Sequence, residues 1–161
     1  MAKAYKPLPA AEELWELFEY RPLTGQLVRR IRGGRVMPGT CFGAVGPKGY
    51  RHGSIDRTRY YAHRLVYVWV TGNDPGQLDI DHIDSDRDNN CFWNLRTCTR
   101  TQNNFNRLAQ GYVEVDGRYY ARICTGNRQV RALGGYSTKA EAYEAYKKAA
   151  LELHGEFSRV N

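Results

Sequence analysis

Turn-forming residues divide the first part of the chain into short segments. Residues 23–61 are rich in glycine and in β-branched or aromatic residues, and turn signals recur at Thr24-Gly25, Gly33-Gly34 and Asp56-Arg57-Thr58. This spacing favours short antiparallel strands. The longest unbroken apolar stretch covers only residues 65–70, whereas a membrane-spanning helix needs roughly 20 apolar residues. We therefore expect a soluble, cytoplasmic α+β protein without a membrane partner.

Two helices are expected around these strands. Residues 9–20 begin with a proline and two acids follow in the first turn, which is typical of a helix N-terminus. Leu14, Leu17 and Phe18 form one apolar stripe of this segment. Residues 62–71 also show helical periodicity, and Gly72 provides an expected C-terminal stop.

The second half of the chain predicts two strand-and-helix units. The first contains strands at 79–83 and 95–97, followed by a helix to about residue 109 that begins at the capping box Thr99-Arg-Thr-Gln102. The second contains a three-strand meander at residues 112–115, 118–124 and 128–133. A second capping box, Thr138-Lys-Ala-Glu141, begins a helix that ends before Gly155 and should cover one face of this sheet.

The charge of the chain favours an anionic partner. There are 24 Lys and Arg against 17 Asp and Glu, a net charge of +7. Residues 1–72 carry net +7, residues 73–110 net −2, and residues 111–161 net +2. This distribution would suit a protein that binds nucleic acid through two basic flanks and a cation in its centre. A solvated basic surface is the alternative, and charge alone does not choose between them.

Cysteine spacing gives no sign of a zinc site. Cys41, Cys91, Cys98 and Cys124 include no pair at the short spacing of a zinc knuckle. We expect partly buried free thiols and no structural zinc.

The acidic centre requires an explanation, because five aspartates and His82 lie between residues 79 and 88. Like charges at this density repel, and a hard cation would relieve that repulsion. An EF-hand does not fit, since Asn89 stands where glycine is needed and Leu95 stands where glutamate is needed. A solvated acidic loop is the simpler interpretation for Asp84, Asp86 and Asp88.

A more specific pattern surrounds this loop. Asn94 follows His82 by twelve residues and Asn103 follows nine later, within the stretches Asp81-His82-Ile-Asp-Ser-Asp-Arg-Asp-Asn-Asn, Asn94-Leu95-Arg96 and Gln102-Asn103-Asn104. Together these stretches resemble the HNH endonuclease motif in its homing-endonuclease-like form. Upstream, Tyr20-Arg-Pro-Leu-Thr-Gly-Gln-Leu27 and His63-Arg64-Leu65-Val66 are also similar to that family. The resemblance implies a nuclease domain over residues 1–110, with a ββα-metal core at about 78–109.

The same resemblance implies roles for individual residues. Asp81 and Asn103 would hold one Mg²⁺ or Mn²⁺ ion, His82 would act as the general base, and Asn94 would orient the loop. Arg64 is a candidate DNA contact. For His63, packing stands slightly ahead of support of the site or contact with a phosphate. Because the CxxC pairs of some HNH nucleases are absent from this sequence, we expect Phe92, Trp93 and Leu95 to anchor the motif by packing.

The last 51 residues predict a separate DNA-binding module. Alternation in the 118–124 strand places Arg118, Tyr120 and Arg122 on an exposed face, where they could contact phosphates and guanines, with Arg128 on the next strand. Residues 111–161 resemble the APETALA-type DNA-binding domain in Tyr119-Tyr-Ala-Arg-Ile, Leu133-Gly-Gly-Tyr-Ser-Thr-Lys-Ala-Glu-Ala-Tyr and Ala149-Ala-Leu-Glu-Leu-His-Gly-Glu-Phe. The third strand departs from that pattern, with Val130 and Ala132 at the expected cationic positions. A structural sheet with exposed arginines is the alternative.

These features predict a metal-dependent HNH endonuclease of the phage homing type that cuts double-stranded DNA in an infected bacterial cell. The expected products carry a 3′-hydroxyl and a 5′-phosphate. The alternative is a sequence-specific DNA-binding regulator that does not cleave.

Overall fold

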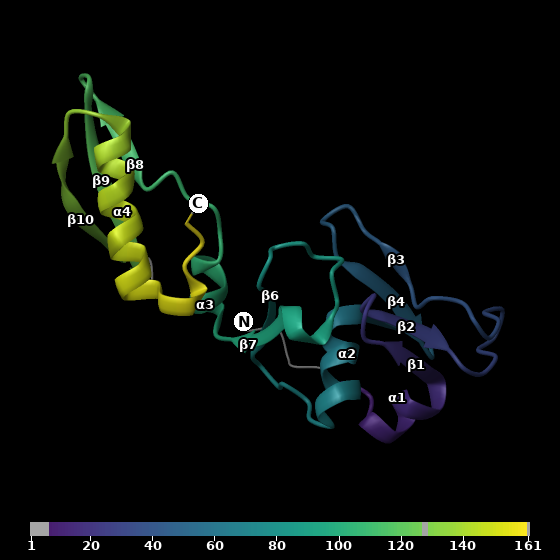
Figure 1. The fold of residues 1–161 in the computed structure, drawn as a ribbon. Helices are drawn as coiled ribbons and strands as arrows, with labels where there is room; N and C mark the ends of the chain where they lie inside the picture. The colour runs from purple at the N-terminus through teal and green to yellow at the C-terminus, as the bar shows by residue number, and fades with distance from the viewer. Residues whose placement is uncertain (1–6, 127–128, 161) are drawn as a thin grey trace. The chain divides into compact units, whose positions relative to one another are not determined.

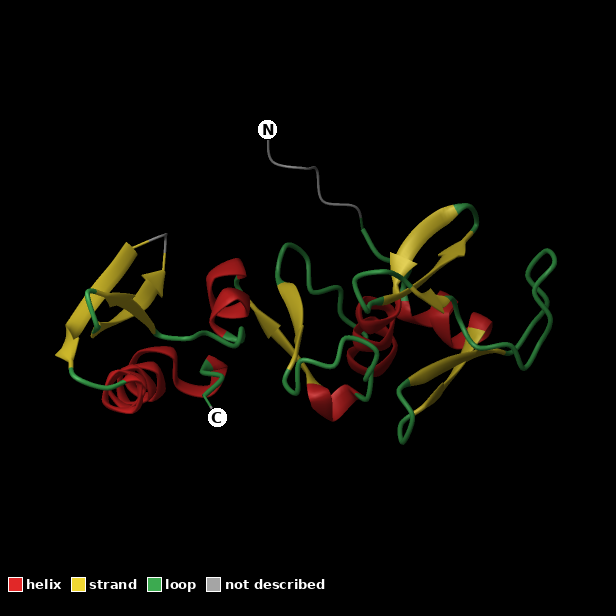
Figure 2. Cartoon of the chain, turned by 90° about the horizontal axis from the view of Figure 1, so that it is seen from above, coloured by secondary structure: helices red, strands yellow, loops and turns green. Residues whose placement is uncertain are grey.

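The computed structural model of the protein describes residues 7–126 and 129–160 (Figure 1). The chain forms two compact units, residues 1–97 and residues 98–161. Each unit combines helices with small antiparallel sheets, so the expected α+β class is confirmed (Figure 2). None of the helices in the described ranges is long and apolar enough to cross a bilayer.

The first helix is shorter than the sequence predicts. Helix α1 covers Ala11–Leu17, and the chain continues directly into strand β1, Phe18–Arg21. β1 pairs antiparallel with β2, Gln26–Arg29, so that Phe18 lies opposite Arg29. Phe18 and Tyr20 are buried while Glu19 and Arg21 are exposed, which is the two-residue period of a strand. Pairing within the β1–β2 hairpin therefore ends the helix before the predicted position.

The expected strands and second helix follow. Strand β4, Arg51–Ile55, lies between β3, Ala44–Val45, and β5, Thr58–Tyr61, in an antiparallel sheet. The two-residue turn between β4 and β5 has positive φ at Asp56 and Arg57, as tight hairpin turns require. Helix α2, Ala62–Thr71, ends as predicted at Gly72, whose φ of 73° is left-handed.

The core of the first unit lies where α1, β1 and α2 meet. Leu14, Phe18, Leu65 and Val66 have no exposed surface. The Trp69 Nε1 atom donates a hydrogen bond to the Phe18 carbonyl oxygen at 3.2 Å, which ties α2 to β1. Burial of this apolar surface is the main stabilising contribution in such a small unit.

The predicted central strands are confirmed. β6 covers Asp79–His82, the 3₁₀ turn η1 covers Phe92–Asn94, and β7 covers Leu95–Cys98; β6 and β7 form a two-stranded sheet. Leu95 is buried and Phe92 packs against the core, but Trp93 is 61% exposed, so the expected anchoring role of Trp93 is wrong. Tyr20 adds an anchor, since its hydroxyl accepts a hydrogen bond from the Phe92 backbone N–H at 2.8 Å.

The third helix belongs to the second compact unit. α3 covers Arg100–Phe105 and has the predicted capping box, but it is shorter than the expected helix to about residue 109. The Phe105 ring stacks on His154 with 3.8 Å between ring centroids, and the helix contacts strand β9, Arg118–Gly126. The units therefore divide between Thr97 and Cys98, whereas the sequence suggested a boundary between residues 110 and 111.

The rest of the second unit is the predicted meander and helix. β9 lies between β8, Tyr112–Val115, and β10, Gln129–Tyr136, and α4, Lys139–His154, packs against β9 before the 3₁₀ turn η2, Gly155–Phe157. The buried residues of α4 recur every four positions, at Ala142, Tyr146, Ala150 and His154. At the end of the helix, the apolar Leu153 is 41% exposed, whereas His154 is buried.

Candidate active site

The last two residues of β6 are a buried acid and a buried histidine. Asp81 and His82 are 7% and 3% exposed. Arg96 on β7 donates two hydrogen bonds to the Asp81 Oδ2 atom, from Nε at 3.0 Å and from a terminal nitrogen at 2.9 Å. Both side chains of this ion pair are largely buried. Arg96 therefore holds the Asp81 carboxylate in place and compensates its charge.

His82 is oriented by an amide that the sequence analysis did not single out. The His82 Nε2 atom lies 3.1 Å from the Asn90 Oδ1 atom, and the Asn90 amide nitrogen donates to the Asp88 carbonyl oxygen at 3.0 Å. The second bond fixes which end of the Asn90 amide faces His82. Because a carbonyl oxygen only accepts, Nε2 carries the proton of neutral His82, and Nδ1 carries the lone pair that can accept another.

Burial determines the protonation of His82. Removal of the ring from water lowers its pKa below the ordinary value of 6.5, while the Asn90 hydrogen bond and the charges of Asp84, Asp81 and Asp86 oppose this shift. The net shift is downward, so His82 is neutral at pH 7. A neutral imidazole with a defined tautomer has the property that a general base needs.

Asn94 fixes the turn that follows His82. Its side-chain nitrogen donates to the Asp84 Oδ1 atom and to the Asn89 carbonyl oxygen, each at 2.9 Å, and its Oδ1 atom accepts from the Asp84 N–H at 3.1 Å. Asn94 is 6% exposed, so these bonds are shielded from water. Its contacts are of the kind expected for a residue that orients the loop.

The acidic loop is more structured than a solvated loop. The pKa of Asp84 is lowered because hydrogen bonds from Asn89, Asn94 and the Asp86 N–H outweigh the raising effect of burial. Asp88 accepts hydrogen bonds from the Arg51 guanidinium at 2.8 and 2.9 Å. Asp84 and Asp86 are exposed, as expected for a solvated loop, and the hydrogen bonds of Asp84 and Asp88 also hold the loop together.

Aromatic rings surround His82. The His63 ring lies edge-on to His82 with 5.1 Å between centroids, and Tyr50 lies 5.9 Å from His82. Tyr61 stacks on His63 at 5.4 Å. Burial lowers the pKa of His63 to about 3, with further contributions from His82 and Arg64, so His63 is neutral. Its Nδ1 atom is buried and has no hydrogen-bond partner in the described part of the chain.

The other predicted site residues lie elsewhere. The guanidinium of Arg64 donates to the carbonyl oxygens of Gly76 and Leu78, each at 2.9 Å, and thus holds the segment before β6. DNA contact by Arg64 stays a prediction.

Asn103 lies on α3, in the second unit. In that unit Arg118, Tyr120 and Arg122 occupy the exposed face of β9, and Ala121 and Ile123 are buried, as predicted. Arg128 falls outside the described residues.

The oxygen donors near β6 suit a hard cation in type. A carboxylate such as Asp81 and amide oxygens are the ligands that Mg²⁺ and Mn²⁺ prefer. Within the described ranges, no three His, Cys, Asp or Glu side chains are grouped so as to hold a metal ion. An ion at Asp81 would share this carboxylate with the Arg96 guanidinium.

Comparison with known proteins agrees with the motif. Residues 60–105 match the family described as HNH endonuclease. An uncharacterized HNH endonuclease of Acanthamoeba polyphaga mimivirus is 30% identical over 122 residues, which cover 73% of this chain and 65% of the viral protein. The chain thus spans just under two thirds of that relative. No solved structure matches the chain. The matched residues 60–105 include β6, β7, α3 and the Asp81-His82 pair.

Proposed function

We propose that this chain is a metal-dependent endonuclease that hydrolyses double-stranded DNA to 3′-hydroxyl and 5′-phosphate ends. The main support is the buried His82, whose Nε2 atom is bonded to Asn90 so that Nδ1 can accept a proton. HNH nucleases generally use a divalent metal ion. A domain of this family with an oriented, neutral histidine beside a carboxylate is suited to activating water for attack on a phosphodiester.

Each residue would have one task. His82 would take the proton from the attacking water, with its ring held by Asn90 and its following turn held by Asn94. Asp81 and Asn103 would bind Mg²⁺ or Mn²⁺, and Arg96 would fix the Asp81 carboxylate. When bound, the ion would stabilise negative charge on the phosphate and on the leaving oxygen.

The basic surfaces would bind the DNA. The exposed row Arg118, Tyr120 and Arg122 on β9 supports a DNA-binding role for residues 111–161, as in the APETALA-type domain that they resemble. Arg64 and Arg128 are further candidate contacts. From the sequence resemblance, we further propose that the protein is a phage homing endonuclease that acts in the infected bacterial cell.

The decisive experiment is cleavage of supercoiled plasmid in Mg²⁺, Mn²⁺ or EDTA. We expect nicked or linear product with metal, none with EDTA, and none with His82→Ala, while His82→Ala binds DNA nearly as well as the natural chain. Asn73→Ala is the matched control and should cleave normally, since the hydrogen bonds of Asn73 to described residues all go to Thr71 at the end of α2. Cleavage that survives in His82→Ala would refute the role of His82 as base.

A non-cleaving DNA-binding regulator is the second candidate. It is favoured by the Arg96–Asp81 ion pair, because a guanidinium already neutralises the carboxylate that would bind the metal. DNA binding without cleavage of plasmid or source-genome DNA in either metal would support the regulator.

A further inference from the structure

The first unit contains a hollow next to the candidate active site. It is a cleft of about 450 Å³ beside the Gly46-Pro47 turn, β4 and β5, lined by Lys48, Tyr50, His52, Arg59, Tyr60 and Tyr61. We call it the tyrosine cleft. Its volume is in the range of pockets that hold small ligands or parts of larger ones.

The charge of the tyrosine cleft is one-sided. None of its lining residues is acidic. Among the described residues, the ammonium group of Lys48 has no ion-pair partner. The guanidinium of Arg59 contacts the His52 ring, with 2.9 Å between a terminal nitrogen and Nδ1. Two cations without carboxylate partners create a positive potential that attracts a polyanion.

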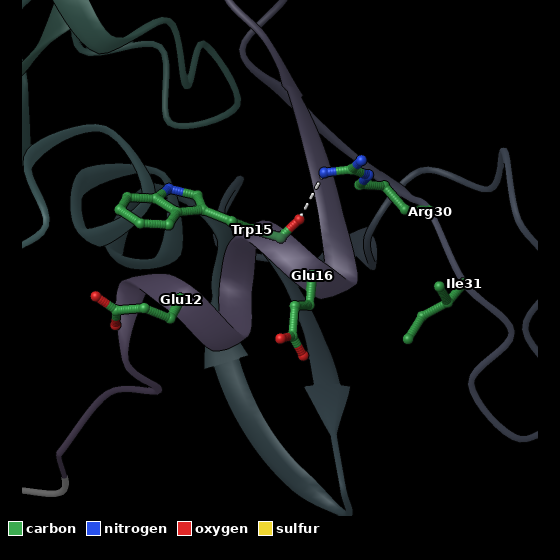
Figure 3. A pocket seen from close by; sticks show the side chains of 5 residues that line it. All are labelled: Glu12, Trp15, Glu16, Arg30 and Ile31. Atoms are coloured by element: carbon green, nitrogen blue, oxygen red, sulfur yellow. Dashed lines mark hydrogen bonds between the residues drawn. The ribbon is translucent and has the colours of Figure 1, made fainter.

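Another hollow in the same unit differs from the tyrosine cleft, because acidic residues line it. Figure 3 shows the pocket lined by Glu12, Trp15, Glu16, Arg30 and Ile31, in which Arg30 donates to the Trp15 carbonyl oxygen at 2.9 Å. Two carboxylates line that pocket and would repel DNA. Of these two hollows, the tyrosine cleft is therefore the one that suits an anionic strand.

A continuous set of rings connects the cleft to His82. Tyr61 is 47% exposed and lines the cleft, yet its ring stacks on the buried His63 with an interplanar angle of 20°. The Tyr61 ring also contacts the rings of Tyr50 and His52 edge-on, at 5.6 and 6.2 Å between centroids. His63 in turn contacts His82 at 5.1 Å.

Tyr50 and Arg87 form a second connection. Tyr50 lines the cleft and lies 5.9 Å from His82, and the Arg87 guanidinium lies over the Tyr50 ring at 5.0 Å. Arg87 also donates to the Lys48 carbonyl oxygen at 2.8 Å, so the loop after His82 is tied to the turn that carries Lys48. The contacts of Tyr50 and Arg87 therefore connect the cleft to His82 and to the loop that follows it.

We propose that the tyrosine cleft binds the DNA strand beside the cleaved phosphodiester, with phosphates on Lys48 and Arg59 and one unstacked base against Tyr61. Cations that follow the backbone and an aromatic ring that takes a base are the usual means of holding a single strand. This inference rests on the proposed nuclease function, because it assigns the cleft to the substrate of His82. A base held here would contact Tyr61, which stacks on His63, and the His63 ring in turn meets His82 edge-on.

The test measures binding without cleavage. A single-stranded DNA 12-mer carrying 2-aminopurine is titrated in EDTA, and its fluorescence reports stacking on a protein ring. We expect Tyr61→Leu to abolish the quenching and to weaken binding about tenfold, and Tyr61→Phe to bind within about twofold of the natural chain. Lys48→Ala with Arg59→Ala should lower the slope of log affinity against log salt by about 1.4.

A matched control removes two charges outside the cleft. Arg32→Ala with Arg35→Ala changes exposed residues of the loop after β2 and should leave the quenching intact. The cleft proposal is overturned if Tyr61→Leu keeps the quenching and Lys48→Ala with Arg59→Ala lowers the salt slope no more than this control does. Plasmid cleavage by the natural chain is measured in parallel. If the natural chain does not cleave, the nuclease function is refuted, and the binding titrations still test whether the cleft binds DNA.

Discussion

The Nε2 atom of His82 lies 3.1 Å from the Oδ1 atom of Asn90, an amide that is itself only 2% exposed. This contact determines which nitrogen of the neutral ring carries the proton. It also joins the end of β6 to the end of the acidic loop, eight residues later. The chemistry proposed for His82 therefore depends on a residue outside the three positions for which the motif is named.

Asn90→Ala tests this dependence. Loss of the acceptor frees the His82 ring to adopt the other tautomer, so we expect cleavage to fall about tenfold to hundredfold, less than in His82→Ala. Plasmid cleavage measures the rate, and ¹⁵N NMR of the histidine rings measures the tautomer. Asn73→Ala should change neither, and an unaltered tautomer in Asn90→Ala would contradict the assignment.

The pH profile of cleavage should reflect the lowered pKa of His82. The neutral ring is the active form, so kcat/KM should rise with pH through a midpoint below 6.5 and then level off. The Asn90 hydrogen bond raises the pKa, and Asn90→Ala should therefore move the midpoint to lower pH. The profile is measured at saturating metal for both proteins; a midpoint above 6.5 would show that another group limits the rate.

Burial of neutral His63 should make stability depend on pH. Its pKa is about 3 when folded and near 6.5 when unfolded, so the stabilisation is complete above pH 6.5 and is lost as pH falls from 6.5 towards 3. This group alone contributes a slope of about 1.4 kcal/mol per pH unit near pH 5. Urea unfolding between pH 4 and 7 should show a shallower slope of stability against pH for His63→Phe than for the natural chain, and an equal slope would contradict this role of His63.

The Arg96–Asp81 pair should be sensitive to removal of one partner. Arg96→Met leaves a buried carboxylate without its cation, and we expect the free energy of unfolding to fall by about 3–5 kcal/mol. Arg51→Met breaks the more exposed pair with Asp88 and should cost about 1 kcal/mol. Urea denaturation at pH 7 compares the two variants; equal losses would mean that burial does not distinguish them.

The arginine row of β9 should contribute to DNA affinity through phosphates. Arg118→Ala with Arg122→Ala should weaken binding to duplex DNA and lower its salt slope by about 1.8. Lys147→Ala with Lys148→Ala removes the same charge from α4, and its slope should fall less. Anisotropy titrations at several salt concentrations compare the variants, and equal slopes would remove β9 from the interface.

Local sequence signals were sufficient for several elements. Thr99 and Thr138 each begin a helix with the expected capping box, and Gly72 ends α2, because these signals act through bonds within a few residues. Alternation along β9 also predicted which side chains are exposed, since the strand period requires no knowledge of the partner. The spacing of Asp81-His82 and Asn94 indicated the HNH motif, and these residues lie within the range that matches the HNH endonuclease family.

Contacts between distant residues decided the rest. Phe18 fits the apolar stripe of a helix, yet pairing with Arg29 makes it the first residue of a strand. Asn90 and Arg96 were visible in the sequence only as a turn former and a basic residue, and the fold made them the partners of His82 and Asp81. The sequence by itself therefore determined the helix caps, the strand period and the nuclease motif, because each is local. Only the tertiary structure decided helix length, unit boundary and the partners of the site, because these depend on which distant groups are buried together.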